Sequence, residues 1–238
     1  MPPQQYEVTV DKVLDAADNV KLIWFKLPAG QYLDFQPGQF MTVLLPREGT
    51  IVRKQYSISS PPFIKDSFEM CVNRIPNGFA SNFLCDLQPG TKLSVIGPYG
   101  VFTLKEPLQH DPIFIATGTG IGPLKSMLDV IWEKKLDNGG DVWLFFGVRT
   151  EKGIIYDQDF KKMEKEHPNF HYIQTLSRPE SDWQGHKGYV QEQVKKYIQS
   201  PDGKEAYICG VIPMVSDVRK TLAELGFPKE KVYFENYV

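Results

Sequence analysis

The first part of the chain alternates apolar and polar positions over short distances. From Tyr6 to about Leu104, brief apolar or β-branched runs are separated by glycine and proline. A period of two is typical of half-buried strands, and regular turn signals between short strands are typical of a barrel or sandwich. The pattern predicts an antiparallel six-stranded β-barrel. Its strands are expected at YEVTVDKVL, VKLIWFKL, QFMTVLLP, QYSISS, SFEMCVNRI and KLSVIG.

One segment of this part interrupts the strand pattern. After Gly78, the residues Phe79, Phe83 and Leu87 recur every four positions, which places them on one face of a helix. We therefore expect a short helix over residues 78–84 that plugs one end of the barrel.

The pattern changes after a linker-like segment at 105–112, which has two prolines and mixed charge. Beyond it, apolar runs alternate with amphipathic segments, as in a parallel sheet with helices on both faces. Five strands are expected, at PIFIAT, DVWLFFG, FHYIQTL, EAYICG and KVYFENY. The first and last helices are marked by Leu124, Met127, Leu128 and Ile131, and by Val215, Val218, Leu222 and Leu225, with Gly226 as the stop. The chain is thus predicted to hold a barrel domain (1–108) and an α/β domain (109–238).

Composition and charge narrow the classes of partner. Of the 238 residues, 42% are hydrophobic and 24% are charged, which is close to the globular average, so a buried core can form. The net charge of −2 gives no general attraction to nucleic acid or to an anionic membrane. No run approaches the roughly 20 apolar residues of a spanning helix, and the segment MPPQQYEVTV lacks the features of a signal or transit peptide. We expect a cytoplasmic protein that is a monomer or a weak dimer.

The sequence also argues against disulfides and metal centres. Cys71, Cys85 and Cys209 are widely separated and odd in number, and they lack the spacing of an iron–sulfur cluster. The four histidines form no metal-ligand pair at helical spacing. We expect no metal site on this chain.

A glycine-rich turn stands between the first strand and the first helix of the second part. It reads Gly118-Thr119-Gly120-Ile121-Gly122-Pro123. Glycines let the backbone approach a pyrophosphate, and the following helix offers free N–H groups and the positive end of its dipole. The alternative is a purely structural turn. Because Pro123 replaces the final Gly or Ala of the Rossmann fingerprint, a different dinucleotide-binding family is indicated.

Several motifs in a fixed order make the chain resemble the ferredoxin–NADP⁺ reductase family. They are KQYSIS (54–59), CVNR (71–74), GFASNFLCDLQPG (78–90), GTGIGP (118–123), SR (177–178), KGYVQ (187–191), CGVIPM (209–214) and ENY (235–237). The resemblance covers nearly the whole length. It implies a flavin-binding antiparallel barrel followed by a pyridine-nucleotide-binding α/β domain, in agreement with the two parts described above.

The resemblance assigns the flavin to the barrel. It puts Lys54 on the flavin phosphate, Tyr56 against the isoalloxazine and Ser57 near its N5 atom. Family members usually have arginine at the position of Lys54, so a lower affinity for the flavin phosphate is implied here. Arg53 could replace Lys54 only through a bulge, because alternation puts Arg53 on the other face of the strand. An ordinary polar strand with Tyr56 in the core is the alternative. The implied flavin-binding set is Lys54, Gln55, Tyr56, Ser57, Cys71, Val72, Asn73, Gly78, Ala80, Ser81, Thr119 and Tyr237.

Within that set, Gly78 to Ser81 resemble a second phosphate-binding segment, although Ser81 alone would suit a routine helix cap. Plant-type members carry a longer loop before this segment, with an aromatic residue on the FAD adenine. Here Ile75–Asn77 alone separate Arg74 from Gly78, so the family's adenine contact is not assigned. The resemblance implies FAD, in an extended or a bent form, with FMN as the alternative.

The resemblance assigns the nucleotide to the second part. Ser177, Arg178, Lys187 and Tyr189 resemble a clamp for the 2′-phosphate and adenine, which favours NADP(H) over NAD(H). A solvated basic loop with Tyr189 packed on a helix is the alternative. The implied nucleotide-binding set is Gly118, Gly120, Pro123, Ser177, Arg178, Lys187, Tyr189, Cys209 and Gly210.

Four residues are implied to be catalytic: Ser57, Cys209, Glu235 and Tyr237. Cys209 would lie against the nicotinamide, Glu235 would border flavin N5, and Tyr237 would cover the flavin until nicotinamide displaces it. Val238 follows the tyrosine, unlike in plant-type members, and a frayed terminus is the alternative.

The implied function is hydride transfer between NADPH and FAD, with single electrons passed to or from a separate carrier such as ferredoxin or flavodoxin. Lys54, Lys65 and Arg74 are candidates for docking that carrier. The alternatives are an NADH-dependent reductase that serves an oxygenase component, a free-flavin reductase, and a catalytically silent flavoprotein or nucleotide sensor.

Overall fold

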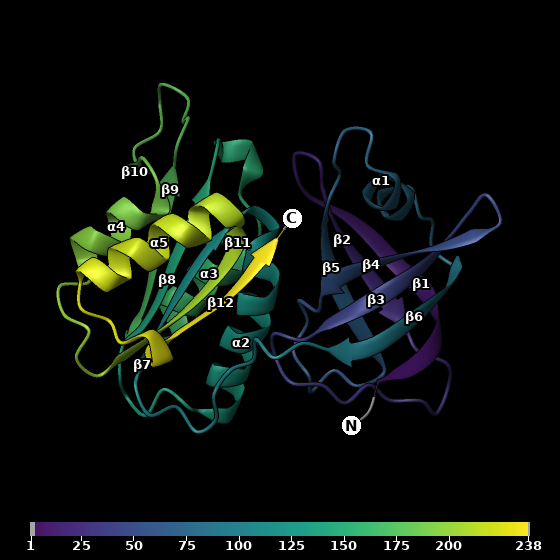
Figure 1. Cartoon of the computed structure of the whole chain (residues 1–238), viewed down its shortest axis with the longest axis horizontal. Helices are drawn as coiled ribbons and strands as arrows, with labels where there is room; N and C mark the ends of the chain where they lie inside the picture. Colours follow the sequence, from purple (N-terminus) through teal and green to yellow (C-terminus); the bar gives the residue numbers. More distant parts are fainter. Residues whose placement is uncertain (1–2, 238) are drawn as a thin grey trace. The chain divides into compact units, whose positions relative to one another are not determined.

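A computed structural model describes residues 3–237, and the chain forms two compact units (Figure 1). We call the first the barrel unit; it contains the residues up to Leu104 together with Lys125–Val130. The second, the sheet unit, contains Lys105–Leu124 and the residues from Ile131 onward.

The barrel unit, within the described residues, is built on one six-stranded antiparallel sheet, as expected. Its strands are β1 (Gln4–Ala17), β2 (Val20–Lys26), β3 (Phe40–Arg47), β4 (Thr50–Ser57), β5 (Ser67–Asn73) and β6 (Lys92–Tyr99). They lie in the order β4-β3-β6-β1-β2-β5. The two end strands meet through a bridge between Ile58 and Met70, which closes the sheet on itself at that point.

Strand β4 starts earlier than predicted, at Thr50 and not near Gln55. The alternation is hidden there because the segment is mostly exposed and carries two adjacent cations. What creates the strand is the tight turn before it, where Glu48 and Gly49 both have positive φ angles (47° and 77°). Two such residues favour a hairpin whose twist matches its strands, so β3 and β4 pair without a register shift.

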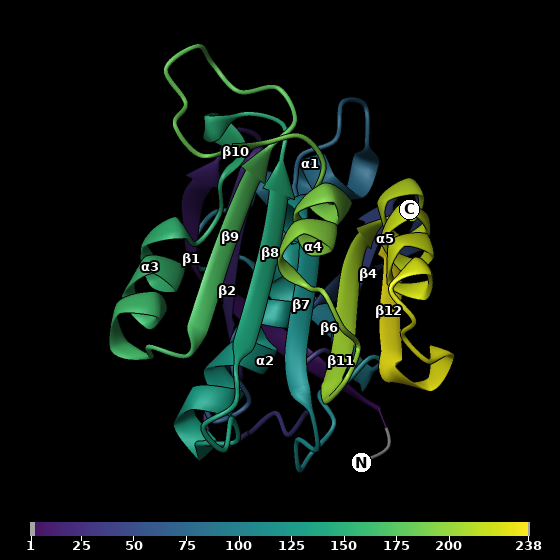
Figure 2. The same cartoon turned by 90° about the vertical axis from the view of Figure 1, so that its left-hand side faces the viewer.

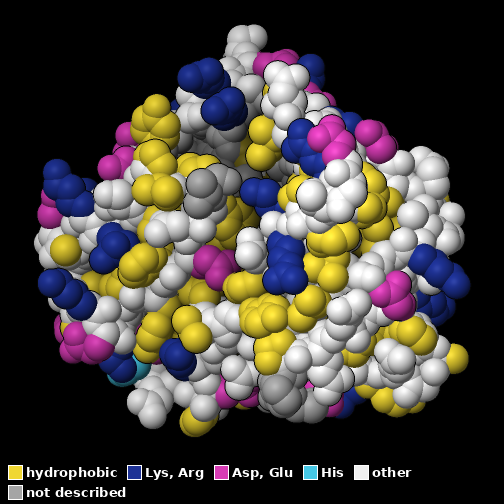
Figure 3. All heavy atoms as spheres, turned by 45° about the vertical axis from the view of Figure 1, so that its right-hand side comes forward, with side chains coloured by type: hydrophobic (Ala, Val, Ile, Leu, Met, Phe, Trp, Pro, Cys, Tyr) yellow, Lys and Arg dark blue, Asp and Glu magenta, His cyan; other side chains and the backbone are white. Residues whose placement is uncertain are grey.

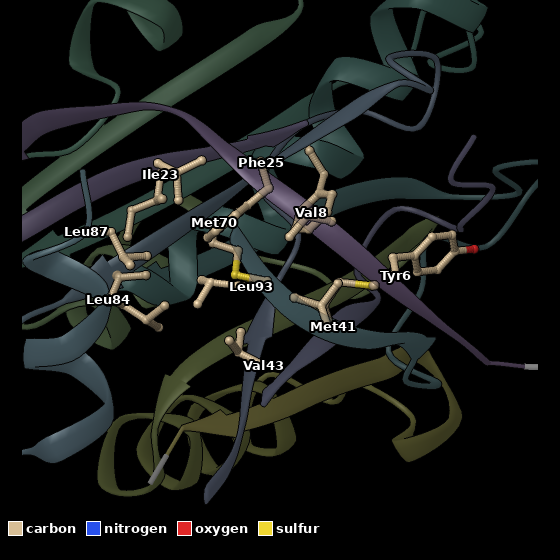
Figure 4. Close-up of a cluster of buried hydrophobic side chains, with 14 of the residues drawn as sticks. Tyr6, Val8, Ile23, Phe25, Met41, Val43, Met70, Leu84, Leu87 and Leu93 are labelled. Carbon is tan, nitrogen blue, oxygen red and sulfur yellow. The ribbon is translucent and has the colours of Figure 1, made fainter. Parts of the chain in front are cut away.

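Alternating side chains fill the interior of the barrel (Figure 4). Val8, Phe25, Met41 and Val43 have no solvent exposure, and the rings of Phe25 and Phe68 stack at 5.3 Å between centroids. This interior is the hydrophobic core that stabilises the barrel unit.

The helix α1 (Phe79–Cys85) confirms the expected short helix, but the most buried face differs from the prediction. Ala80, Leu84 and Cys85 are buried against the barrel core, whereas Phe79 and Phe83 are only partly buried at its margin. Small residues let the helix approach the barrel closely, which moves the larger rings to the side.

The sheet unit is a parallel sheet with one more strand than the five predicted, counted over the described residues. Its strands are β7 (Asp111–Thr117), β8 (Val142–Val148), β9 (Phe170–Leu176), β10 (His186–Lys187), β11 (Lys204–Val211) and β12 (Val232–Tyr237). They lie in the order β10-β9-β8-β7-β11-β12. The additional strand, β10, has two residues, too few to show any periodicity.

Helices cover both faces of this sheet, as predicted (Figure 2). They are α2 (Ile121–Lys134), α3 (Asp157–Glu166), α4 (Val190–Tyr197) and α5 (Ile212–Glu224), with short 3-10 turns η1 (Gly118–Gly120), η2 (Glu151–Gly153) and η3 (Lys229–Lys231). Apolar residues of α4 and α5 pack on Ile115 and Ile208. On the other face, Trp132 at the end of α2 meets Phe170, and Phe160 of α3 meets Tyr172.

The surface is mixed in charge. On the face shown in Figure 3, lysine and arginine side chains are interspersed with acidic and hydrophobic ones. Among residues 3–237, no helix is both long and apolar enough to cross a membrane.

Candidate functional site

Strands β4 and β5 run side by side without pairing along most of their length, and we call this region the β4–β5 seam. β4 pairs with β3 and β5 pairs with β2. The two strands join at the Ile58–Met70 bridge and through the Ser59 N–H, which donates to the Glu69 carbonyl at 2.9 Å. Over the described residues, the backbone of β4 therefore has no strand partner on its seam side from Thr50 to Tyr56.

The seam brings together the residues that were predicted to bind flavin from the barrel. Ser57, Tyr56 and Gln55 directly precede Ile58 of the bridge, and Cys71, Val72 and Asn73 directly follow Met70, its partner. Helix α1 lies beside them, close enough for the Cys85 thiol to influence the titration of Tyr56. Three separate segments of the sequence thus converge on one side of the barrel.

The alternation on β4 is regular. Lys54 and Tyr56 pair with the fully buried Val43 and Met41, so both belong to the inward face, whereas Arg53 pairs with Leu44 on the other. The ladder between β3 and β4 has no bulge, so the alternative in which Arg53 takes the place of Lys54 is not realised.

Cations without acidic partners line this hairpin. Among residues 3–237, neither Arg47, Arg53 nor Lys54 forms an ion pair. An exposed lysine beside an unpaired backbone edge suits an anionic ligand such as a phosphate. By contrast, two of the predicted docking residues are paired: Lys65 with Asp34 at 3.0 Å and Arg74 with Asp86 at 2.6 Å.

Tyr56 presents a neutral ring to the seam. Burial, and secondarily the Cys85 thiol, raise the pKa of its phenol to about 12. The hydroxyl therefore stays protonated at physiological pH, and the side chain offers an apolar plane with a hydrogen-bond donor at its end.

Ser81 has a structural role in this geometry. Its hydroxyl accepts from the Ile75 N–H at 3.1 Å and donates to the Gly78 carbonyl at 3.3 Å. These bonds order the tight turn before α1, but Ser81 lies inside the helix and is not its N-cap, which is Gly78 without a side-chain cap. Its predicted contact with flavin stays a prediction.

In the sheet unit, the carboxyl ends of the neighbouring strands β8, β7 and β11 meet at the predicted nucleotide turn. Strand β7 runs into η1, and α2 follows with Pro123 in its first turn. The expected strand, turn and helix are confirmed. Ligands of open parallel sheets bind at this edge.

The glycines in and beside the turn differ in how much space surrounds them. Gly118 has φ +52° and open space where a Cβ would lie. A Cβ on Gly120 would lie 2.6 Å from the Cys209 carbonyl carbon and closer still to its oxygen. A Cβ on Gly210 would lie 2.6 Å from Thr117 Oγ1. Gly120 and Gly210 thus let β7, η1 and β11 approach one another, a structural need, while Gly118 leaves open space beside the turn.

Thr117 is a residue that the sequence reasoning missed. Its hydroxyl oxygen is buried and finds no hydrogen-bond partner within the described residues. A buried unpaired hydroxyl is costly unless something satisfies it, and this one lies beside the predicted nucleotide turn. The only signal in the sequence is its position directly before the glycine turn.

Three predicted catalytic residues lie together on β11 and β12. Cys209 pairs in register with Glu235 and has no solvent exposure. Burial raises the pKa of its thiol well above the ordinary value, the Glu235 carboxylate raises it further, and a hydrogen bond from the Tyr237 side chain acts in the opposite sense. The thiol is thus neutral, and Tyr237 is anchored to it.

The residues predicted to hold the adenosine end also converge. The Arg178 N–H donates to the Arg149 carbonyl at 2.7 Å, and the Gly188 N–H donates to the Leu176 carbonyl at 2.9 Å. These bonds bring the ends of β8, β9 and β10 together. Arg149 was not predicted. Neither Arg149, Arg178 nor Lys187 has an acidic partner among residues 3–237, and Tyr189 is 62% exposed.

Thr119 and Tyr237 belong to the sheet unit, and the other flavin residues belong to the barrel unit. Their predicted contacts with the flavin stay predictions.

Comparisons with known proteins also assign a flavin-binding domain to the first part of the chain and a nucleotide-binding domain to the second. The family described as "Oxidoreductase FAD-binding domain" matches residues 7–104, and the family described as "Oxidoreductase NAD-binding domain" matches residues 114–220. Ferredoxin–NADP reductase B of Sorangium cellulosum is 33% identical, over 98% of each chain. The reductase component DmpP of phenol 2-monooxygenase from a Pseudomonas strain is 30% identical over 99% of this chain, which spans 66% of that relative.

Solved structures show the same fold. The cytochrome P450 reductase GcoB of Amycolatopsis aligns with a TM-score of 0.91 at 24% identity, over 99% of this chain and 70% of its own. A ferredoxin NADP⁺ reductase from Neisseria gonorrhoeae with bound FAD and NADP aligns with a TM-score of 0.83 at 19% identity, over 99% of both chains. The chain belongs to the ferredoxin–NADP⁺ reductase family of FAD- and pyridine-nucleotide-binding oxidoreductases.

Proposed function

We propose that this chain transfers hydride between NADPH and FAD, and single electrons between FAD and a separate carrier protein such as ferredoxin or flavodoxin. The observation that carries the proposal is the match to a ferredoxin–NADP reductase along nearly the full length of both chains. The bound flavin supplies the chemistry, because it exchanges a hydride on one side and single electrons on the other.

The residues of the β4–β5 seam fit a flavin. Lys54 supplies a point charge for the phosphate, and Tyr56 supplies a neutral ring for the isoalloxazine face. The unpaired edge of β4 offers backbone donors and acceptors to the polar rim of the ring system. Ser57 is proposed to hydrogen-bond near N5.

The residues at the sheet edge fit a nicotinamide dinucleotide. The turn at Gly118 lets a pyrophosphate approach, and the orphan Thr117 hydroxyl is placed to bond a polar group of the nicotinamide end. Cys209 is proposed to set the position of that ring, Tyr237 to leave it room when displaced, and Glu235 to border flavin N5. Correct positioning of the two reacting rings is the main contribution that the protein makes.

NADPH is the proposed nucleotide because Arg149, Arg178 and Lys187 gather at one end of the sheet edge and have no acidic partners within residues 3–237. A 2′-phosphate dianion would satisfy them. The test is a titration of the purified, flavin-loaded protein with NADPH and NADH. We expect NADPH to bind at least tenfold more tightly, and Arg178→Ala to remove most of that preference while leaving NADH binding unchanged.

A second candidate is an NADH-dependent reductase serving an oxygenase component. It is favoured by DmpP, described as the reductase component of phenol 2-monooxygenase, which matches over 99% of this chain. Equal or better binding of NADH in the same titration would select this candidate.

The cofactor itself is tested by gel filtration of the purified protein. Flavin that stays with the protein through the column contradicts a free-flavin reductase. Rapid bleaching of that flavin by NADPH in a stopped-flow experiment contradicts a catalytically silent flavoprotein.

A further inference from the structure

The loop between β9 and β10, residues 177–185, carries Arg178 and extends beyond the end of the sheet (Figure 1). No residue from 177 to 187 is buried. Apolar packing therefore contributes little to fixing the place of the Arg178 side chain. Its position depends on the hydrogen bonds that hold the backbone on each side of it.

Two hydrogen bonds hold this stretch of the loop against the segment that follows β8. The Arg178 N–H donates to the Arg149 carbonyl at 2.7 Å. Two residues further along, the Glu180 N–H donates to both carboxylate oxygens of Glu151, at 3.0 Å and 3.3 Å. Between the two donors, Pro179 has no N–H and favours an extended conformation for the residue before it. The backbone of Arg178 is therefore fixed from both sides.

Glu151 is itself held in place by the turn η2. The Gly153 N–H donates to the Thr150 carbonyl at 3.0 Å, and the Ile154 N–H donates to the Glu151 carbonyl at 3.1 Å. The Glu151 residue is partly buried, unlike the exposed Glu180. A carboxylate that accepts from a backbone N–H makes a stronger bond than a neutral acceptor does. Glu151 is thus a firm point to which the loop is attached.

The charge of Glu151 does not neutralise the neighbouring cations. Within residues 3–237, Glu151 forms no ion pair, and neither Arg149 nor Arg178 forms one. A carboxylate paired with Arg178 would compete with an anionic ligand for the guanidinium. A carboxylate that binds a backbone N–H orders the loop and leaves the guanidinium to the ligand.

We propose that Glu151 is a positioning residue for the choice of nucleotide: by accepting the Glu180 N–H, it keeps Arg178 in place for the 2′-phosphate of NADPH. The inference rests on the proposed function. NADH has no 2′-phosphate, so it gains nothing from a fixed Arg178. Glu151 should therefore matter for the binding of NADPH and not for that of NADH.

Two competing explanations have different consequences. If the Glu151 carboxylate mainly repels the phosphate through space, its removal tightens the binding of NADPH. If the carboxylate serves only the stability of the fold, its removal affects NADPH and NADH alike. Positioning alone weakens NADPH binding and spares NADH.

The experiment titrates the flavin-loaded protein with NADPH and NADH, and follows hydrogen exchange at the Glu180 amide by NMR. Glu151→Ala should weaken NADPH binding about fivefold, leave NADH binding unchanged and speed the exchange of that amide. Glu151→Gln keeps an acceptor oxygen and should restore most of the affinity. Glu180→Ala is the matched control: it removes a carboxylate from the same stretch but keeps the N–H, so it should weaken the binding of neither nucleotide.

A double-mutant cycle shows whether Glu151 acts through Arg178. In an Arg178→Ala background, Glu151→Ala should cause no further loss of NADPH affinity, because there is no guanidinium left to position. Losses that add in the double variant overturn the inference.

Other results would also overturn it. They are unchanged or tighter NADPH binding by Glu151→Ala, equal losses for the two nucleotides, and unchanged exchange of the Glu180 amide. Each of these leaves the proposed function standing as long as the unmodified protein prefers NADPH. Equal binding of NADPH and NADH by the unmodified protein would instead contradict the proposed nucleotide, and the role of Glu151 with it.

Discussion

The two proposed binding regions achieve recognition in opposite ways. The β4–β5 seam presents a strand edge that has no strand partner from Thr50 to Tyr56 within the described chain, with Lys54 and Tyr56 as its main groups. The sheet edge is shaped by missing side chains, because Gly120 and Gly210 let β7, η1 and β11 touch. Substitutions in the seam should therefore change affinity, whereas substitutions at the sheet edge should first change stability.

The largest expected effect is that of Gly120→Ala. The added methyl would overlap the Cys209 carbonyl group, and overpacking of this kind costs up to about 3 kcal/mol. Urea unfolding should show this loss in the free energy of unfolding. Gly118→Ala is the control, since its surroundings are open and its positive φ costs about 1 kcal/mol. Similar losses in the two variants would contradict the distinction between the two glycines.

Lys54→Ala should have the next largest effect, on affinity and not on stability. Losing an exposed charge-assisted hydrogen bond to phosphate should weaken the binding of both flavins about tenfold. Lys54→Arg should bind more tightly than the unmodified chain, because a guanidinium grips a phosphate with two bonds. Flavin fluorescence titrations measure both changes, and a fall in the midpoint of unfolding without a change in affinity would count against the seam.

Tyr237→Ser should change the affinity for the nucleotide several-fold, and in the opposite direction, toward tighter binding. The side chain hydrogen-bonds to Cys209 and is proposed to occupy space that the nicotinamide needs. Its removal should tighten nucleotide binding and relax the choice between NADPH and NADH. Unchanged affinity for both nucleotides in a titration would remove the gating role.

The smallest expected effect concerns pH and His186 on β10. Burial, and then the nearby Lys196, lower the pKa of this imidazole, whose Nε2 is 3.1 Å from the Tyr197 hydroxyl oxygen. The unfolded chain therefore takes up a proton near pH 6.5 that the folded chain resists, so stability falls as the pH drops below that value. His186→Gln should lose less thermal stability between pH 8 and pH 5.5. A loss equal to that of the unmodified chain would show that His186 is not involved.

Periodicity predicted most of the fold because most elements bury one face. It located the barrel strands and the helix over residues 78–84, and it identified the parallel sheet. It missed the start of β4, where Arg53 and Lys54 hide the alternation, and it missed β10, which is two residues long.

Motifs named candidate site residues, whereas features created by tertiary approach left no signal in the sequence. Lys54, Tyr56 and Cys209 came from motifs. The orphan hydroxyl of Thr117, the position of Arg149 beside Arg178, and the hydrogen bond from the Glu180 N–H to Glu151 depend on segments that are distant in sequence or belong to different elements. No pattern along a single strand encodes such neighbours.

The unpaired side of β4 has a further consequence for the protein without its flavin. A strand edge with free hydrogen-bonding groups is a template for self-association, and natural proteins discourage this with charged residues on the edge. Arg53 and Lys54 are well placed for that duty. Lys54, which is proposed to hold a cofactor phosphate, would together with Arg53 also keep newly made, flavin-free chains from aggregating, so solubility during synthesis would not depend on the supply of flavin.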